Sequence, residues 1–274
     1  MLAILDDAEA AAGESVPLRL QCVRERARVH REARAWREAD EAYARAESLT
    51  ERDSVRRCAL LTEWGEMLLT EAADAARAEG VLREALTGAP ASGPLLARIQ
   101  LLLGDVLVDK FDREGFLPDL YEGCHLLEQA ARKAADPGPR ARAWLRLGLA
   151  RRHFPPGDPQ HGRAEEAFNR ALSEARSADG PEDGPGPASG AEAGSGSGSG
   201  SWEGGTGAAG PDPYVTARAR FGRGAFHETR GRPGAALADY RAARAEWRRL
   251  RGLGLGVPED EVRATDARIA ALGG

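Results

Sequence analysis

A pair of predicted helices near the middle of the chain constrains the fold more than any other feature. In residues 141–175, Trp144, Leu147 and Gly148 recur at helical spacing, and a second apolar stripe of the same period follows, formed by Ala164, Phe168, Ala171 and Leu172. A proline-rich turn separates the two stretches. Glycine inside a helix costs about 1 kcal/mol relative to alanine, so Gly148 indicates close approach of another backbone. The stretch therefore predicts a helical hairpin with small residues at its crossing.

The same pattern recurs along the chain, which makes chance an unlikely source. Gly65 and Gly104 occupy the position of Gly148, at spacings of 39 and 44 residues. Ala27 takes this position in a degenerate first copy of the repeat, and Gly224 takes it in the last copy. Such spacing predicts one helical hairpin per unit. Beside the middle hairpin, we expect helices over residues 18–33 and 36–49, 55–70 and 74–86, 95–108 and 120–134, and 214–229 and 233–250, with an extended turn over residues 109–119.

The motif W-x-x-L-G from Trp144 to Gly148, followed by A-x-x-x-F-x-x-A from Ala164 to Ala171, resembles the tetratricopeptide repeat (TPR) family. Its turn is about four residues longer than in the common 34-residue form. Roughly residues 95–178 are similar to the long-loop TPR arrays of bacterial multidomain proteins with caspase-like or signalling ATPase domains, although no caspase-like Cys–His region accompanies them. The resemblance implies an all-α fold, a right-handed α-solenoid of about five hairpins. A C-terminal capping helix begins near Pro258.

One segment is expected to interrupt the array. Residues 179–212 consist mainly of Gly, Ser, Pro and Ala, a composition that cannot bury enough apolar surface to offset its ordering entropy. We expect an N-terminal helix and four hairpins in residues 1–178, a disordered linker in 179–212, and the fifth hairpin with the capping helix in 213–274, continuing the same solenoid. Residues 1–12 are interpreted as the second half of a unit that begins in a longer protein. Trp202 is interpreted as an isolated linker residue, with docking into a groove as the alternative.

Composition and missing motifs exclude several classes of function. The net charge of −5, with a pI near 5.7, disfavours nucleic-acid and membrane-surface binding. No apolar run approaches the roughly 20 residues of a membrane span. Three isolated cysteines, Cys22, Cys58 and Cys124, indicate reduced, buried thiols in a cytoplasmic protein. The sequence has no G-x-x-x-x-G-K-[ST], G-x-S-x-G, H-E-x-x-H or C-x-x-C motif, so we expect no enzyme activity, cofactor or metal. His153 and His161 are interpreted as exposed loop histidines.

The resemblance also implies a binding surface, because the first helix of each TPR hairpin lines a concave groove. Carried over by motif, the predicted groove residues are Arg98, Leu102 and Asp105 of the third unit, Arg142, Arg146, Leu149 and Arg152 of the fourth, and Phe221 of the last. Arg142 and Arg146 lie one turn apart, as in carboxylate-clamp TPR domains, but Glu66 and Leu102 replace the clamp asparagines. The alternative is that these arginines form surface ion pairs with neighbouring acids.

These features predict a non-catalytic protein–protein interaction module. Its partner is expected to be another protein or a peptide that presents an acidic segment or a free C-terminus. The alternatives are a regulatory sensor, with a signalling peptide or small molecule in the groove, and a helical enzyme with an unrecognised site. Partner retention in a pull-down would favour the interaction module, and ligand-induced thermal stabilisation would favour the sensor. The sequence predicts no particular partner, pathway or oligomeric state.

Overall fold

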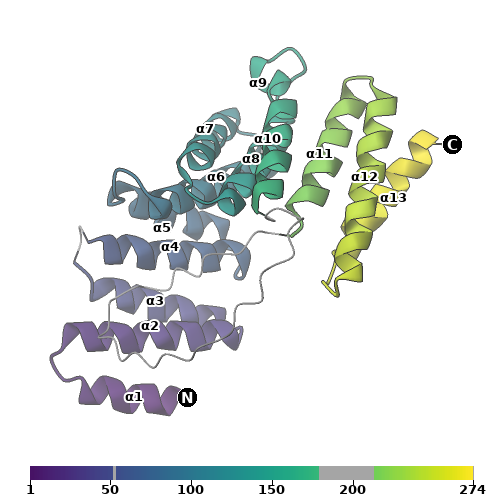
Figure 1. Ribbon diagram of the computed structural model, residues 1–274. Coiled ribbons are helices and arrows are strands. Elements are labelled where there is room, and N and C mark those ends of the chain that lie inside the picture. The colour runs from purple at the N-terminus through teal and green to yellow at the C-terminus, as the bar shows by residue number, and fades with distance from the viewer. Residues whose placement is uncertain (52–53, 179–212, 274) are drawn as a thin grey trace, which may run out of the picture. The chain divides into compact units, whose positions relative to one another are not determined.

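A computed structural model describes residues 1–51, 54–178 and 213–273, and every regular element in these ranges is a helix (Figure 1). The predicted all-α fold of helical hairpins is confirmed. The elements are α1 (Leu2–Ala11), α2 (Val16–Glu32), α3 (Trp36–Ser48), α4 (Val55–Thr70), α5 (Ala75–Thr87), α6 (Pro94–Glu114), α7 (Leu117–Lys133), α8 (Pro137–Arg151), α9 (Pro159–Gly162), α10 (Ala164–Ala178), α11 (Val215–Thr229), α12 (Pro233–Gly252) and α13 (Glu259–Gly273).

The described residues form two compact units, which we treat separately. Unit 1 comprises Met1–Ala135 and Arg146–Ala167, and unit 2 comprises Asp136–Leu145 and Phe168–Gly274. Helices α8 and α10 therefore contribute residues to both units. Whether unit 2 continues the solenoid of unit 1 stays a prediction. The predicted linker, residues 179–212 with Trp202, lies outside the described residues.

Unit 1 is built from hairpins whose successive helices lie side by side, as α1 to α5 show in Figure 1. Its core is one continuous apolar cluster with contributions from α2 to α7. Glycines set the closest approaches: a Cβ built on Gly65 would lie 2.6 Å from Leu82 Cγ, and one on Gly104 would lie 2.7 Å from Leu127 Cγ. The predicted close contact at these two positions is confirmed, because no larger side chain fits without movement.

The extended turn predicted over residues 109–119 is wrong. Helix α6 continues to Glu114, and only Gly115 and Phe116 separate it from α7. Lys110 stabilises this last stretch, since its Nζ lies 3.2 Å from Glu79 Oε2 and 3.5 Å from Asp119 Oδ2. Gly115 then ends the helix with φ = 72°, a left-handed conformation that glycine adopts at little cost.

A long turn does separate α8 from α10, and it contains the short helix α9. Arg151, at the end of α8, is 3% exposed; its Nη2 donates to Glu128 Oε2 at 2.8 Å and its Nε to Gln160 Oε1 at 3.1 Å. A buried arginine needs such partners, so these bonds fix the turn against α7. His153 is exposed, as predicted, but His161 is only 3% exposed because α9 packs it inward.

In unit 2, α11 and α12 form a hairpin and α13 packs against α12 (Figure 1). A Cβ on Gly224 would lie 3.0 Å from the Tyr240 ring, so this hairpin also closes on a glycine. Glu261 of α13 accepts from Arg218 Nη2 at 2.7 Å, which ties the last helix to α11. The only buried residue of α13 is Thr265, so the helix presents most of its surface outward, as the predicted capping helix should. None of the described helices combines the length and apolarity needed to cross a membrane.

Candidate partner-binding surfaces

Arginine–carboxylate pairs join the first helices of neighbouring hairpins in unit 1. Arg24 of α2 donates from Nη2 to Glu63 Oε1 of α4 at 2.9 Å, and Arg98 of α6 pairs with Glu66 of α4. These four side chains are 25–34% exposed, so they are partly shielded from solvent. Each pair therefore links α4 to the first helix of the hairpin before it or after it.

Arg146 of α8 extends this arrangement by contacting two carboxylates on α6. Its Nε donates to Asp105 Oδ1 at 2.6 Å, and its Nη2 donates to Asp109 Oδ1 at 3.1 Å. The charge of Asp105 is the largest cause that raises the pKa of Arg146, and burial opposes it. Two carboxylates one helical turn apart thus surround one planar guanidinium. We refer to the contacts Arg24–Glu63, Arg98–Glu66, Arg146–Asp105 and Arg146–Asp109 as the inter-repeat ion pairs.

The inter-repeat ion pairs involve arginines that were predicted to form a basic groove. Arg98 and Arg146 are compensated by acidic side chains of the preceding hairpin, which is the ion-pair alternative considered for them. Asp105, also a predicted groove residue, is the partner of Arg146. A partner carboxylate would therefore meet arginines that already hold a carboxylate.

The three apolar side chains among the predicted groove residues differ in how far they are buried. Leu102 is 7% exposed and belongs to the core cluster of unit 1, so little of its surface is left for a partner, and its role as a groove residue stays a prediction. It lies on the inner stripe of a helix that is covered on several sides. Leu149 is half-buried. Phe221 is half-buried as well, and its ring lies 5.3 Å from that of Tyr240, which anchors it within unit 2.

The predicted groove residues are divided between the two units. Arg142 and Phe221 belong to unit 2, whereas Arg98, Asp105, Arg146, Leu149 and Arg152 belong to unit 1 with the buried Leu102. Arg142 and Arg152 are both half-buried. A single groove formed by all of these residues stays a prediction.

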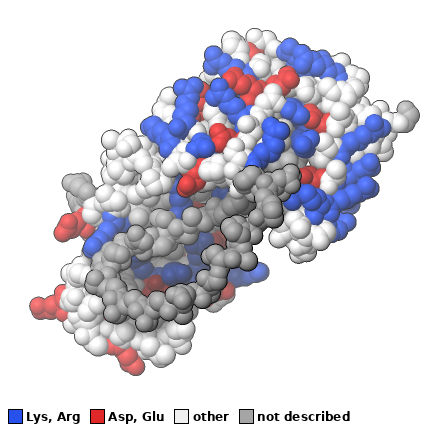
Figure 2. Space-filling model, viewed as in Figure 1, with Lys and Arg blue, Asp and Glu red and all other residues white. Residues whose placement is uncertain are grey.

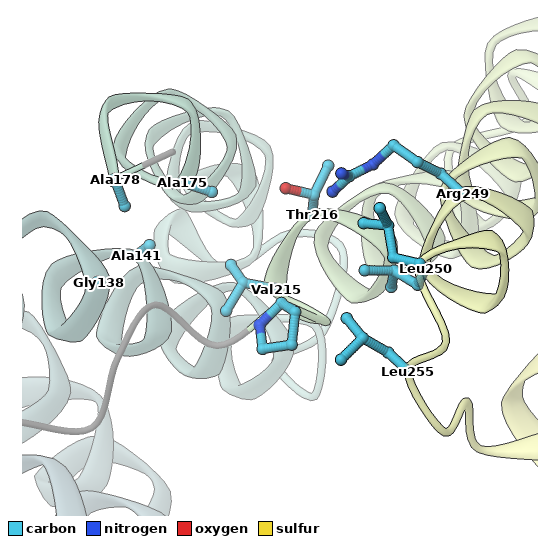
Figure 3. Close-up of a pocket in the computed structure, with 11 residues that line it drawn as sticks. Gly138, Ala141, Ala175, Ala178, Val215, Thr216, Arg249, Leu250 and Leu255 are labelled. Atoms are coloured by element: carbon cyan, nitrogen blue, oxygen red, sulfur yellow. The ribbon is translucent and has the colours of Figure 1, made fainter. Parts of the chain in front are cut away.

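Unit 2 contains a cavity of about 180 Å³ that the sequence analysis did not predict. Small residues of α8 and α10 form one side, and residues from the start of α11 and the end of α12 form the other (Figure 3). The loop after α12 completes the wall. The lining residues are Gly138, Ala141, Ala175, Ala178, Pro213, Val215, Thr216, Arg249, Leu250, Leu253 and Leu255.

The cavity lining is mostly apolar, with one charged side chain. Arg249 is held by Glu246, whose Oε1 accepts from its Nε at 2.7 Å, and the Arg249 side chain remains 52% exposed. A signal for this site was present in the sequence. Leu253 and Leu255 alternate with glycines in a loop, where two large apolar side chains have no helical core to enter.

The part of the chain that the structure describes offers no site for metal chemistry. It contains no group of three or more His, Cys, Asp or Glu side chains that could hold an ion. His153 lies 3.4 Å from Asp112 of α6, and these two side chains alone do not make such a group. Among the cysteines, Cys58 and Cys124 are buried as predicted, whereas Cys22 is half-buried.

Comparison with known proteins supports the fold class defined by these hairpins. No family model matches the chain, and no curated protein sequence matches it significantly. The architecture is that of a TPR-like helical repeat. Among solved structures, the crystal structure of MamA protein is similar with a TM-score of 0.55 and 14% sequence identity, over 87% of this chain and 97% of that chain. At this identity the likeness shows the fold alone.

Proposed function

We propose that the protein is a non-catalytic scaffold that binds a partner protein or peptide along the first helices of its hairpins. The observation that carries this proposal is the set of inter-repeat ion pairs, which fix α2, α4, α6 and the end of α8 beside one another. A surface whose side chains are already ordered loses less conformational entropy when a partner binds. The TPR-like fold of the structural neighbour supports the same general role.

The proposed partner presents an acidic segment or a free C-terminus near Arg146. Arginine's planar fork suits a carboxylate, and the 31% exposure of the Arg146 side chain leaves it reachable from solvent. Asp105 and Asp109 compete with such a partner for the same guanidinium. The partner's carboxylate would displace Asp105 or Asp109 from the Arg146 guanidinium. The two aspartates would therefore lower the affinity for the partner, whereas Arg146 would supply the attraction.

This competition gives a test with effects of opposite sign. The tagged full-length chain first captures a partner, and the purified pair is then titrated at low and high salt. Asp105→Asn with Asp109→Asn is expected to tighten binding severalfold, because Arg146 loses its internal partners, whereas Arg146→Ala is expected to weaken binding severalfold. Salt should weaken the wild-type complex, since screening reaches about 10 Å at 0.1 M.

A matched control is available on the second helices of the hairpins. Glu122→Gln removes one of the two carboxylate partners of Arg83, in an ion pair of similar kind between α5 and α7, and should leave affinity unchanged; the other partner is Glu79 of α5 itself. Circular dichroism would check that each variant keeps its helical content. If all variants bind the partner alike, the first-helix surface is not the binding site. If no protein is captured and a small molecule raises the melting temperature instead, the scaffold proposal fails.

A further inference from the structure

The cavity in unit 2 has the size and lining of a pocket for one side chain. We propose that it receives a ring-sized apolar side chain of an acidic partner peptide, with a neighbouring peptide carboxylate paired to Arg249. This inference rests on the proposed scaffold role but concerns a surface other than the inter-repeat ion pairs.

The volume fits a single aromatic or branched aliphatic group. At about 180 Å³ the cavity is slightly larger than an apolar protein cavity of about 150 Å³ that binds benzene. Val215 is 1% exposed and Leu250 is fully buried, so the deep walls are fixed parts of the hairpin core. Ala175 and Ala178 on the opposite side have no bulk with which to fill the space. An apolar group that enters would be removed from water on several sides.

The rim favours a peptide over a small molecule. Leu253 is 63% exposed and Leu255 is 38% exposed, and both line the cavity from the loop after α12. Figure 3 labels Leu255. Gly254 between them has φ = 76°, which turns the loop there. A ligand small enough for the cavity alone would leave both leucines in water. A peptide backbone crossing the mouth would cover both leucines and exclude water from them. Contacts around an interface hot spot exclude water in the same way.

The excess of arginine in the C-terminal residues indicates that the peptide carries negative charge. Residues 213–274 contain twelve arginines and seven acidic residues, although the whole chain has a net charge of −5. Figure 2 shows the basic side chains gathered over the C-terminal helices. Arg249 lies in the cavity wall itself, held in place by Glu246. An anchor residue flanked by carboxylates complements this surface, whereas one flanked by lysines is repelled.

The test uses the full chain and three fluorescent peptides, followed by fluorescence anisotropy. The first carries one phenylalanine between glutamates, the second has serine in place of phenylalanine, and the third has lysines in place of the glutamates. We expect the first to bind about tenfold tighter than either other peptide, because only it supplies both anchor and charge. Leu253→Ser with Leu255→Ser, and separately Arg249→Glu, should each reduce that affinity about tenfold.

Two matched control variants distinguish binding in the cavity from non-specific binding elsewhere on the surface. Arg248→Glu changes the same charge on the adjacent residue of α12, which does not line the cavity, and Leu18→Ser removes a 53% exposed leucine of α2. Both should leave affinity within about twofold. Equal loss in Arg248→Glu and Arg249→Glu, equal binding of the three peptides, or no saturable binding of the first peptide overturns the proposal.

Two other occupants would also overturn the proposal. Binding seen only after residues 179–212 are removed would show that the chain's own segment fills the cavity. A dimer in sedimentation that Leu253→Ser with Leu255→Ser abolishes would show that a second copy fills it. The scaffold proposal fails separately, through the Asp105, Asp109 and Arg146 variants, so the two outcomes are distinguishable.

Discussion

At the scale of single residues, the crossing of α6 and α7 leaves no room for a side chain at Gly104. A Cβ on Gly104 would lie 2.7 Å from Leu127 Cγ and 3.2 Å from the carbonyl oxygen of Gly123. Leu127 is fully buried, so it cannot swing into solvent to make room. Gly104→Val is therefore expected to lower the free energy of unfolding by about 1–3 kcal/mol through overpacking. Urea unfolding followed by circular dichroism would measure the change.

Gly80 provides the matched control, because it is a helical glycine without neighbours. It lies inside α5, is exposed, and has no atom within 4 Å of a Cβ placed on it. Gly80→Ala should raise the free energy of unfolding by about 0.5–1 kcal/mol, since alanine favours the helix and has less backbone freedom to lose. A Gly104→Val protein as stable as the wild type would mean that α6 and α7 do not cross as described.

Cys124 of α7 allows a prediction about chemical reactivity. Burial is the largest cause that raises the pKa of its thiol to about 12, while the nearby Arg151 charge lowers it and Glu128 raises it. Only the thiolate is nucleophilic, so iodoacetamide at pH 8 should modify the half-buried Cys22 long before Cys124. Peptide mapping by mass spectrometry would follow both sites. Equal modification rates in the native protein would contradict the burial of Cys124.

The same thiol predicts a loss of stability at alkaline pH. In the unfolded chain it ionises near its ordinary pKa of 9.0, whereas in the folded chain it stays protonated to about 12. The folded state thus binds the proton more tightly, and this contribution is full below pH 9 and is lost as the pH rises toward 12. The stability difference between the wild type and Cys124→Ala should accordingly shrink between pH 8 and about pH 11.

At the scale of elements, the hairpins could be predicted from the sequence because their signal is local. Small and large residues at helical spacing mark each crossing, and the structure places Gly65, Gly104 and Gly224 against the paired helix. The end of α6 could not be predicted in this way. Residues 109–114 are polar except for Phe111 and suggest a turn, but Lys110 reaches Glu79, 31 residues earlier, and stabilises the helix.

The candidate sites could not be predicted from local patterns either, because their contacts join residues that are far apart in the sequence. The partners in the inter-repeat ion pairs lie 32 to 41 residues apart, and their pairing depends on how the first helices pack. Sequence motifs could place Arg98 and Arg146 on first helices, but they could not show which carboxylates these arginines contact. The cavity of unit 2 draws its walls from four helices and a loop, so no single stretch of sequence contains it.

At the scale of the whole molecule, the remaining question is whether residues 179–212 matter for folding. Ala178 and Pro213, the residues on either side of this segment, line the same cavity, so the two ends that it joins lie near each other within unit 2. A much shorter connection can therefore span them. The cost of closing a loop rises only with the logarithm of its length, so a six-residue Gly/Ser replacement should stabilise the protein by about 1–2 kcal/mol at most.

Thermal unfolding of the shortened chain beside the wild type would test this expectation. We predict an equal or slightly higher melting temperature and unchanged helical content, because the replaced residues have a composition that cannot form a core. As a control, Trp202→Ala in the full-length chain should leave the melting temperature unchanged. A cooperative loss of helix in the shortened chain would show that the segment packs against the helices. A loss caused by Trp202→Ala alone would assign that packing to the tryptophan.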